Sequence, residues 1–316
     1  MKRKSVSYAK WGYIFLIPFF AVYCVFSLYP LIQTFYYSFM DYQLDKGAIG
    51  GGWTREVVEV VPEWCGFGNY SEIFKSGSDF FQTIWNTISM WLIGFIPQIL
   101  VSLILAVWFT DLNLKLKAQG FFKTVIYLPN VIMASAIAFL FYNLCSKGGA
   151  LYDIFGFDVL AENAWSARSV VGFINFILWY GNTTILLMAA IMGVDPSLYE
   201  SAQIDGATST DIFWKITMPL IRPILSFVLI TSLIGGLQMY DVPSLLTNDL
   251  GNPIVEGKPT LKTIVMIIQT NKDGNIGKAS ALSVLIFIFT LIIGLAMMLT
   301  SEGNDKKKKK KKKARG

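Results

Sequence analysis

The sequence predicts an all-α integral membrane protein with six transmembrane helices and both termini on the cytoplasmic side. Of its 316 residues, 54% are apolar and only 15% are charged, whereas about 25% of the residues of a soluble domain are charged. All 27 Lys and Arg residues and all 21 Asp and Glu residues lie outside six stretches, which are 11–40, 80–110, 124–146, 169–194, 223–240 and 279–301. A helix of roughly 20 apolar residues crosses the apolar core of a bilayer, so each stretch is predicted to be one spanning helix.

The distribution of basic residues predicts the orientation. If both termini are cytoplasmic, the inner segments hold 18 Lys and Arg in 66 residues and the outer segments hold 9 in 99. Cytoplasmic loops carry the excess of Lys and Arg in membrane proteins. Residues 1–10 are therefore predicted to be a cytoplasmic N-terminus, 11–300 a six-helix transmembrane domain, and 301–316 a disordered cytoplasmic tail with eight consecutive lysines. Because no aromatic residue interrupts the lysines, the tail is expected to contact anionic lipid headgroups rather than nucleic acid.

Missing residue types exclude several kinds of chemistry. The chain contains no histidine, so catalytic sites of the Ser-His-Asp or Cys-His type and His-ligated metal sites are excluded. Cys24, Cys65 and Cys145 are too few and too scattered for a thiolate metal site. A disulfide between Cys65 and Cys145 remains open, although unpaired thiols are the favoured interpretation. We therefore expect no enzyme activity in this chain, and no metal or cofactor bound by it.

The centres of the six stretches carry no ionisable side chain. Carriers that couple to protons or sodium usually hold such groups in the middle of their helices. Here Lys123, Arg222, Asp241 and Lys278 lie at the ends of stretches, and only Asp241 keeps an ion-coupled carrier open as an alternative. Because the chain also lacks a phosphate-binding loop, the energy for uphill transport is expected to come from another subunit.

The segment between the fourth and fifth stretches predicts two short helices. Asp195 is placed to cap the first helix, Pro196 suits its first position, and Gly206 supplies the left-handed residue that ends it. The second helix is predicted to begin near Ser209 and to stop before Pro219. Isolated helices this short are marginal in water, so a partner protein is expected to cover them. The first helix offers that partner a narrow face of mostly small residues, which are Tyr199, Ala202, Gln203 and Gly206.

The same segment, 195–223, carries a specific pattern of residues. It is formed by Glu200, Ser201, Ala202, Gly206, Phe213, Ile216 and Pro219. In this pattern the chain resembles the permease subunits of binding-protein-dependent ABC importers, in the carbohydrate branch that includes the maltose and glycerol-3-phosphate systems. That family has alanine where this chain has Ser201, which is a change between two small residues. Further matches extend the resemblance over most of the chain, at residues 29–30, 38–39, 66–70, 86–87 and 128–129.

The resemblance implies the type I ABC importer permease fold and a location in the bacterial cell membrane. It implies that this chain forms half of a path for a sugar or oligosaccharide that an extracytoplasmic binding protein delivers. A second permease subunit, expected to be a distinct chain, would form the other half, and a cytoplasmic ATPase dimer would bind ATP and magnesium. The segment 195–223 would seat on the ATPase as a coupling helix. Glu200 would pair with a basic residue there, Ala202 would keep the helix thin, and Gly206 would allow the turn.

The resemblance also places the substrate path chiefly on the fourth and fifth spans. Their side chains suit a neutral sugar, because aromatic rings stack on its apolar faces while amides and hydroxyls bind its hydroxyl groups. The candidate residues are Trp179, Tyr180, Asn182, Ser232, Gly236, Gln238 and Tyr240. Helix packing is an equal alternative for the aromatic residues and the favoured one for Gly236. A permease for another polar solute, such as glycerol phosphate or an amino acid, remains open as an alternative function.

Overall fold

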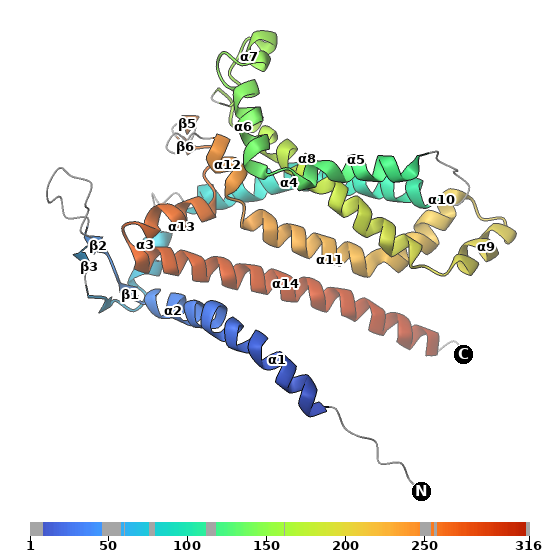
Figure 1. The fold of residues 1–316 in the computed structure, drawn as a ribbon, viewed down its shortest axis with the longest axis horizontal. Coiled ribbons are helices and arrows are strands. Elements are labelled where there is room, and N and C mark those ends of the chain that lie inside the picture. Colours follow the sequence, from blue (N-terminus) through green and yellow to red (C-terminus); the bar gives the residue numbers. More distant parts are fainter. Residues whose placement is uncertain are drawn as a thin grey trace, which may run out of the picture. The chain divides into compact units, whose positions relative to one another are not determined.

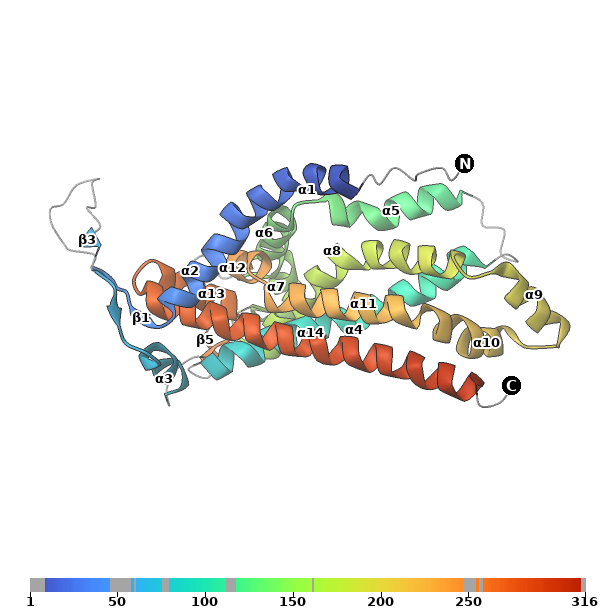
Figure 2. The same ribbon diagram turned by 90° about the horizontal axis from the view of Figure 1, so that it is seen from below.

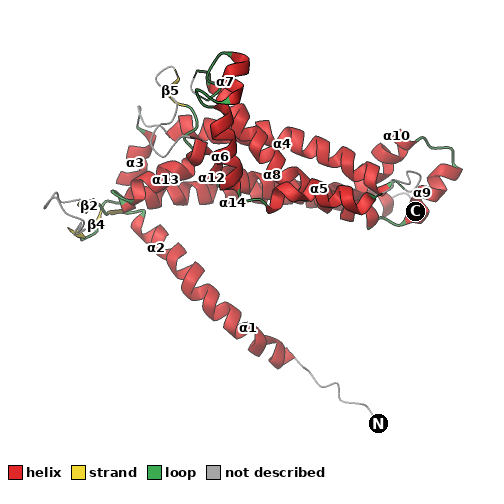
Figure 3. Cartoon of the chain, turned by 45° about the horizontal axis from the view of Figure 1, so that its top comes forward, coloured by secondary structure: helices red, strands yellow, loops and turns green. Residues whose placement is uncertain are grey.

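The computed structural model describes residues 9–45, 58–59, 61–75, 80–111, 118–160, 162–246, 254–255 and 258–313. Helices make up nearly all of the described chain, and its strands are short (Figure 3). The chain forms two compact units, one of Met1–Ser78 with Ile267–Ile288 and one of Asp79–Met266 with Phe289–Gly316.

The predicted membrane-crossing elements are present. Within the described residues, five helices are long and apolar enough to span a membrane, namely Trp11–Tyr37, Phe80–Thr110, Ala164–Met192, Ser209–Leu237 and Ile276–Ala296. A sixth span is made by a bent pair, Gln119–Val131 and Ala134–Ile154, if the pair counts as one. Each of the six charge-free stretches therefore corresponds to one of these elements.

The third of the predicted spans, 124–146, is broken in the structure. α5 (Gln119–Val131) ends two residues after Pro129, and α6 (Ala134–Cys145) starts in a new direction (Figure 1). The bend between the two helices is 83°. Ile132, between them, has extended backbone, which cannot continue a helix. A stretch without charges reports only that a segment is apolar, so it did not reveal the break.

The fifth span begins earlier than predicted and is continuous. α10 (Ser209–Ile212) runs through η2, a π-helix over Phe213–Thr217, directly into α11 (Met218–Leu237). The prediction that a short helix stops before Pro219 was wrong. The backbone N–H of Met218 bonds to a carbonyl five residues earlier, and Pro219 follows this wide turn in the first turn of α11. A proline at that position is tolerated, because its missing N–H is not needed there.

The unit around the fourth and fifth spans is built on three long helices. The long helices are α4 (Phe80–Thr110), α8 (Ala164–Met192) and α11. The unit also contains α7 (Ala150–Phe155), α9 (Pro196–Ile204), α12 (Asp241–Leu246), and the antiparallel strands β5 (Ile254–Val255) and β6 (Lys258–Pro259). α4, α8 and α11 run side by side, with α9 and α10 at one end and α12 at the other (Figures 1 and 2).

α4 and α8 approach closely because glycines meet at their contact. A Cβ atom on Gly94 would lie 2.7 Å from the carbonyl oxygen of Gly172, so a larger residue would push the helices apart. One turn further along α4, Gln98 Nε2 donates a hydrogen bond of 2.7 Å to Thr183 Oγ1. The small residues and the buried hydrogen bond together fix this pair of helices.

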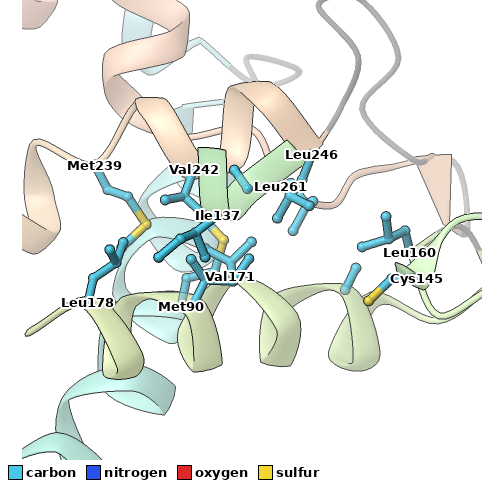
Figure 4. Packing of buried hydrophobic residues seen from close by; sticks show 13 residues of the cluster. Met90, Ile137, Cys145, Leu160, Val171, Leu178, Met239, Val242, Leu246 and Leu261 are labelled. Atoms are coloured by element: carbon cyan, nitrogen blue, oxygen red, sulfur yellow. The ribbon is translucent and has the colours of Figure 1, made fainter. Parts of the chain in front are cut away.

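A buried apolar cluster lies where α4, α6, α8 and α12 meet (Figure 4). Met90, Ile137, Val171 and Val242 come from these four helices, and Leu261 comes from the segment that follows β6. Burying such side chains supplies about 1.5–3 kcal/mol each in an aqueous setting. The cluster therefore holds α6, α12 and the segment that follows β6 against α4 and α8.

A buried polar group lies beside this cluster. Arg168 is only 6% exposed, and its Nη2 donates a hydrogen bond of 2.7 Å to Oδ1 of Asn86. Asn86 in turn donates from Nδ2 to the carbonyl oxygens of Pro259, at 2.8 Å, and Lys262, at 3.1 Å. The guanidinium also lies 5.5 Å from the centre of the Trp165 ring. A buried cation needs such contacts, and here they hold the segment after β6 on α4 and α8.

The other unit contains the first span and short strands. Its elements are α1 (Ala9–Tyr23), η1 (Cys24–Leu28), α2 (Tyr29–Tyr37), β1 (Met40–Asp41), β2 (Leu44–Asp45), β3 (Val58–Glu59), β4 (Glu63–Trp64) and α3 (Gly68–Phe74), with most of α13 (Ile264–Lys272) and the start of α14 (Ile276–Lys313). β1 pairs antiparallel with β4, and β2 pairs antiparallel with β3.

Two further expectations concern the tail and the cysteines. α14 includes the lysine run as far as Lys313, and the disorder expected of residues 301–316 stays a prediction. A helix that has already formed extends by one hydrogen bond for each residue it orders, so the preceding span can carry it onward. Cys24, Cys65 and Cys145 are free thiols in the structure.

Asn69 ties distant parts of the first unit together. Its Nδ2 donates to the carbonyl oxygens of Ser38, at 3.1 Å, and Met40, at 2.8 Å, and the hydroxyl of Tyr70 donates to Oγ of Ser38 at 2.8 Å. Gly277 packs against the same turn, because a Cβ atom there would lie 2.1 Å from the carbonyl oxygen of Met40. The segments that contain Met40, Asn69 and Gly277 therefore meet at one point.

This contact generates a stability prediction. Gly277→Ala is expected to lower stability by roughly 1–3 kcal/mol, because the added methyl group meets a backbone carbonyl that cannot turn away. The measurement is the thermal unfolding midpoint of the purified protein in detergent. Gly274→Ala is the matched control, since a Cβ atom there meets nothing within 4 Å. Equal midpoints for the two variants would contradict the contact.

Candidate functional site

A cavity lies between the middle parts of α4, α8 and α11. Its volume is about 420 Å³, which is within the range of about 300–1,000 Å³ found for small-molecule sites. Its lining residues are Trp91, Gly94, Phe95 and Gln98 from α4, Asn175, Trp179, Asn182, Thr183 and Leu186 from α8, and Phe227, Val228, Thr231, Ser232, Gly235 and Gly236 from α11, with Met239 beyond. All of these residues except Met239 lie within the candidate membrane spans.

The structure brings together part of the predicted substrate path. Trp179, Asn182, Ser232 and Gly236 all line the cavity. Their contact with a substrate stays a prediction.

Three of the predicted residues are not among those that line it, namely Tyr180, Gln238 and Tyr240. The ring of Tyr180 packs 5.3 Å from that of Phe176 on the same helix, measured between ring centres. Gln238 ends α11, and Tyr240 immediately precedes α12. The sequence showed which spans hold polar residues, but the direction of each side chain depends on how those spans pack.

The sequence analysis missed the wall that α4 contributes. Trp91, Gly94, Phe95 and Gln98 are spaced at i, i+3, i+4 and i+7, which places them on one face of a helix. An amide and two aromatic residues at this spacing in an apolar span were a signal that could have identified them. The resemblance had pointed only to the fourth and fifth spans, so α4 was not considered.

Every residue that lines the cavity is uncharged. Some polar groups are already used within the protein, as Asn175 donates from Nδ2 to the carbonyl oxygen of Val171 at 2.9 Å. Asn182 makes no side-chain hydrogen bond to any described residue, so its amide is available to a ligand. Trp179 is 51% exposed, which leaves much of its indole uncovered. The cavity thus offers amides, hydroxyls and aromatic surfaces but no charge.

The segment between α8 and α11 begins as predicted. Asp195 accepts a hydrogen bond of 3.0 Å from the backbone N–H of Ser197 and thereby caps α9. Pro196 occupies the first turn. Gly206 has a φ of +78°, the left-handed conformation that ends the helix. Thr208 caps α10 by accepting from the N–H of Asp211 at 3.2 Å.

One face of α9 lines a second cavity. Tyr199 and Gln203, which were expected to face a partner protein, line this cavity of about 330 Å³, and their contact with a partner stays a prediction. Residues from α10, from the ends of α4 and α8, and from η2, including Phe213, form most of the rest of its wall. The hydroxyl of Thr217 donates to that of Tyr199 at 3.4 Å. Tyr199 therefore lies on the side of α9 that faces the ends of α4 and α8.

The outer face of α9 carries different residues. Leu198, Glu200, Ser201 and Ile204 are exposed, and Ile204 is exposed by 86%. Of the other residues in the predicted coupling pattern, Ala202, Phe213 and Ile216 are half-buried, while Gly206 and Pro219 are exposed. Among the described residues of its unit, none covers the surface on which this isoleucine lies.

Comparison with known proteins supports the fold and the family. Residues 98–309 match the family described as "Binding-protein-dependent transport system inner membrane component". The lactose transport system permease protein of Rhizobium radiobacter is 30% identical over 77% of this chain and 78% of its own length. The multiple sugar-binding transport system permease protein of Streptococcus mutans is 28% identical over 95% of this chain and 97% of its own length.

A solved structure shares the fold. The crystal structure of a bacterial ABC transporter involved in the import of the acidic polysaccharide alginate contains a similar chain, with a TM-score of 0.65 and 22% identity. The match covers 93% of this chain and 95% of that one. The family match spans α8, the segment that follows it and α11, so the chain belongs to the inner membrane components of binding-protein-dependent transport systems, and it is a multi-pass membrane protein.

Proposed function

We propose that this chain is the permease subunit of an ATP-driven importer for a neutral sugar or oligosaccharide, which an extracytoplasmic binding protein delivers. The observation that carries the proposal is the uncharged cavity between α4, α8 and α11. Its indole rings suit the apolar faces of sugar rings, and the free amide of Asn182 suits a hydroxyl group. The sugar permeases among the relatives support the same substrate class.

The neutral cavity disfavours the other candidate functions. A glycerol phosphate, an amino acid or an acidic saccharide would need an opposite charge to offset the cost of removing its own charge from water. An ion-coupled carrier would need an ionisable group inside a span. Asp241, the residue that kept this alternative open in the sequence, lies exposed at the start of α12.

The expected partner subunits follow from the energy source that uphill transport requires. ATP and magnesium would bind to a separate cytoplasmic ATPase dimer, and a second, distinct permease subunit would complete the path. The outer face of α9 would seat on the ATPase, with Ile204 entering an apolar hollow and Glu200 facing a basic side chain. Both termini would then be cytoplasmic, on the same side as α9.

The substrate role of the cavity is tested at Asn182. Asn182→Ala is expected to lower sugar uptake by about tenfold, because it removes an amide that no described residue occupies. Uptake by vesicles containing the full importer, together with ATP hydrolysis without substrate, is the measurement, and hydrolysis is expected to be unchanged. Gln238→Ala is the matched control, since Gln238 is an exposed amide outside the cavity lining. Equal uptake by both variants would place the substrate elsewhere.

The docking role of α9 is tested at Ile204. Ile204→Ser is expected to reduce co-purification of the ATPase and sugar uptake by on the order of tenfold, because an exposed apolar anchor is lost while α9 keeps its own contacts. Ile154→Ser is the control, because Ile154 is 72% exposed on α7 and undergoes the same chemical change. Retention of the ATPase by the Ile204 variant at the level of the control would contradict the docking surface.

A further inference from the structure

Trp91 has an unusually well-defined position in the wall of the cavity. Its Nε1–H donates a hydrogen bond of 3.0 Å to Oγ of Ser232 on α11. Its ring stacks on that of Phe95 with the centres 5.2 Å apart and the planes 16° apart. A hydrogen bond to one helix and a stacked ring on its own helix together fix the orientation of the indole.

Gly236 makes room for this indole. A Cβ atom on Gly236 would lie 2.2 Å from Cδ1 of Trp91 and 2.6 Å from its Cγ, which no side chain tolerates. The neighbouring Gly235 is different, because a Cβ atom there meets nothing within 4 Å. Both glycines line the cavity, but only Gly236 is a notch for the ring. The close approach expected at Gly236 is therefore between α11 and one side chain of α4.

The indole also has a partner across the cavity. Trp91 belongs to the α4 wall and Trp179 to the α8 wall, and both line the same space of about 420 Å³. The depth of Trp91 in the Gly236 notch therefore decides how much of that space a ligand can use. Because α4 and α8 are held by the contact of Gly94 with Gly172, this space is set by the indole rather than by movement of those helices.

We propose that Trp91, seated by Ser232 and Gly236, is a residue that determines which length of saccharide the permease accepts. The proposal rests on the proposed function, since it assumes that the cavity holds a sugar. Displacing the indole into the cavity should exclude longer saccharides first, and removing it should admit them. Discrimination by filling or emptying a pocket typically amounts to about 10–200-fold per methylene-sized group.

The experiment compares variants that move the indole in opposite ways. Gly236→Ala forces the ring out of its notch, Trp91→Ala removes the ring, and Gly294→Ala on α14 is the control, because a Cβ atom there meets nothing within 4 Å and Gly294 is not among the cavity-lining residues. Each variant is reconstituted in vesicles with the binding protein, the ATPase and the second permease, all unchanged. The probes are radiolabelled maltose with maltotriose, and arabinobiose with arabinotriose. The quantity is the ratio of kcat/KM for the trisaccharide to that for the disaccharide.

The expected result is a change of selectivity with opposite signs. Gly236→Ala is expected to lower the ratio by on the order of tenfold, Trp91→Ala to raise it by a similar factor, and Gly294→Ala to leave it unchanged. A merely structural role would reduce both saccharides by the same factor, so an unchanged ratio in both variants would overturn the proposal. Equal effects of the two glycine variants would also overturn it.

Failure of the proposed function gives a different result. If the unaltered importer transports none of the four saccharides, the sugar assignment fails and the role of Trp91 falls with it. If the unaltered importer transports them and only the selectivity test fails, the function stands and the inference about Trp91 is wrong. The amount of each variant in the vesicles is measured, so that rates are compared per assembled importer.

Discussion

The close contact between α4 and α8 is the constraint on which the cavity depends. Inside a membrane, helices gain little from burying apolar surface against each other, so small residues and buried hydrogen bonds must hold them. Gly94 and Gly172 let the two backbones approach, and Gln98 bonds to Thr183 one turn away. With this pair fixed, α11 meets α4 through the indole of Trp91. The cavity is the space that this arrangement leaves.

The two ends of the same helices are finished in different ways. At one end, Arg168 and Asn86 satisfy each other and hold the segment after β6 through the carbonyl oxygens of Pro259 and Lys262. A buried guanidinium with these bonds resists displacement, because separating it from them would leave a charge without compensation. At the other end, α9 and α10 leave a second cavity and expose Ile204. At the Arg168 end, hydrogen bonds within the unit hold the helix ends and the following segment together, whereas the α9 end presents an exposed surface.

The continuity of α10, η2 and α11 links the second of these ends to the cavity. Ser209 and Ser232 lie on one uninterrupted helical element, which the predicted stop before Pro219 would have divided. A helix rises about 1.5 Å per residue, so this element of 29 residues is about 44 Å long and exceeds the roughly 30 Å core of a bilayer without a break. Contacts made by α10 therefore act on the same helical element that contains Gly236. The broken third span, with extended backbone at Ile132, has no such continuity.

The sequence alone was sufficient for features that depend on local chemistry. Charge cannot lie at the centre of a span, so charge-free stretches located all six membrane elements. The cap at Asp195 and the left-handed Gly206 were predictable for the same reason, because each acts within a few residues of itself. The uncharged character of the cavity also followed from composition, since its walls come from those stretches.

Tertiary structure decided which of these residues meet. Trp91 and Ser232 are 141 positions apart, and Asn86 and Lys262 are 176 apart, so no local pattern could pair them. Tyr180 and Trp179 are neighbours in the sequence, yet only Trp179 lines the cavity, because the packing of α8 on α4 sets the register of both. Tyr199 lines the second cavity for the same reason, because the packing of α9 sets the direction of its side chain. Helix propensity and hydropathy are summed along the chain, whereas the direction of a side chain depends on the partner against which its helix packs.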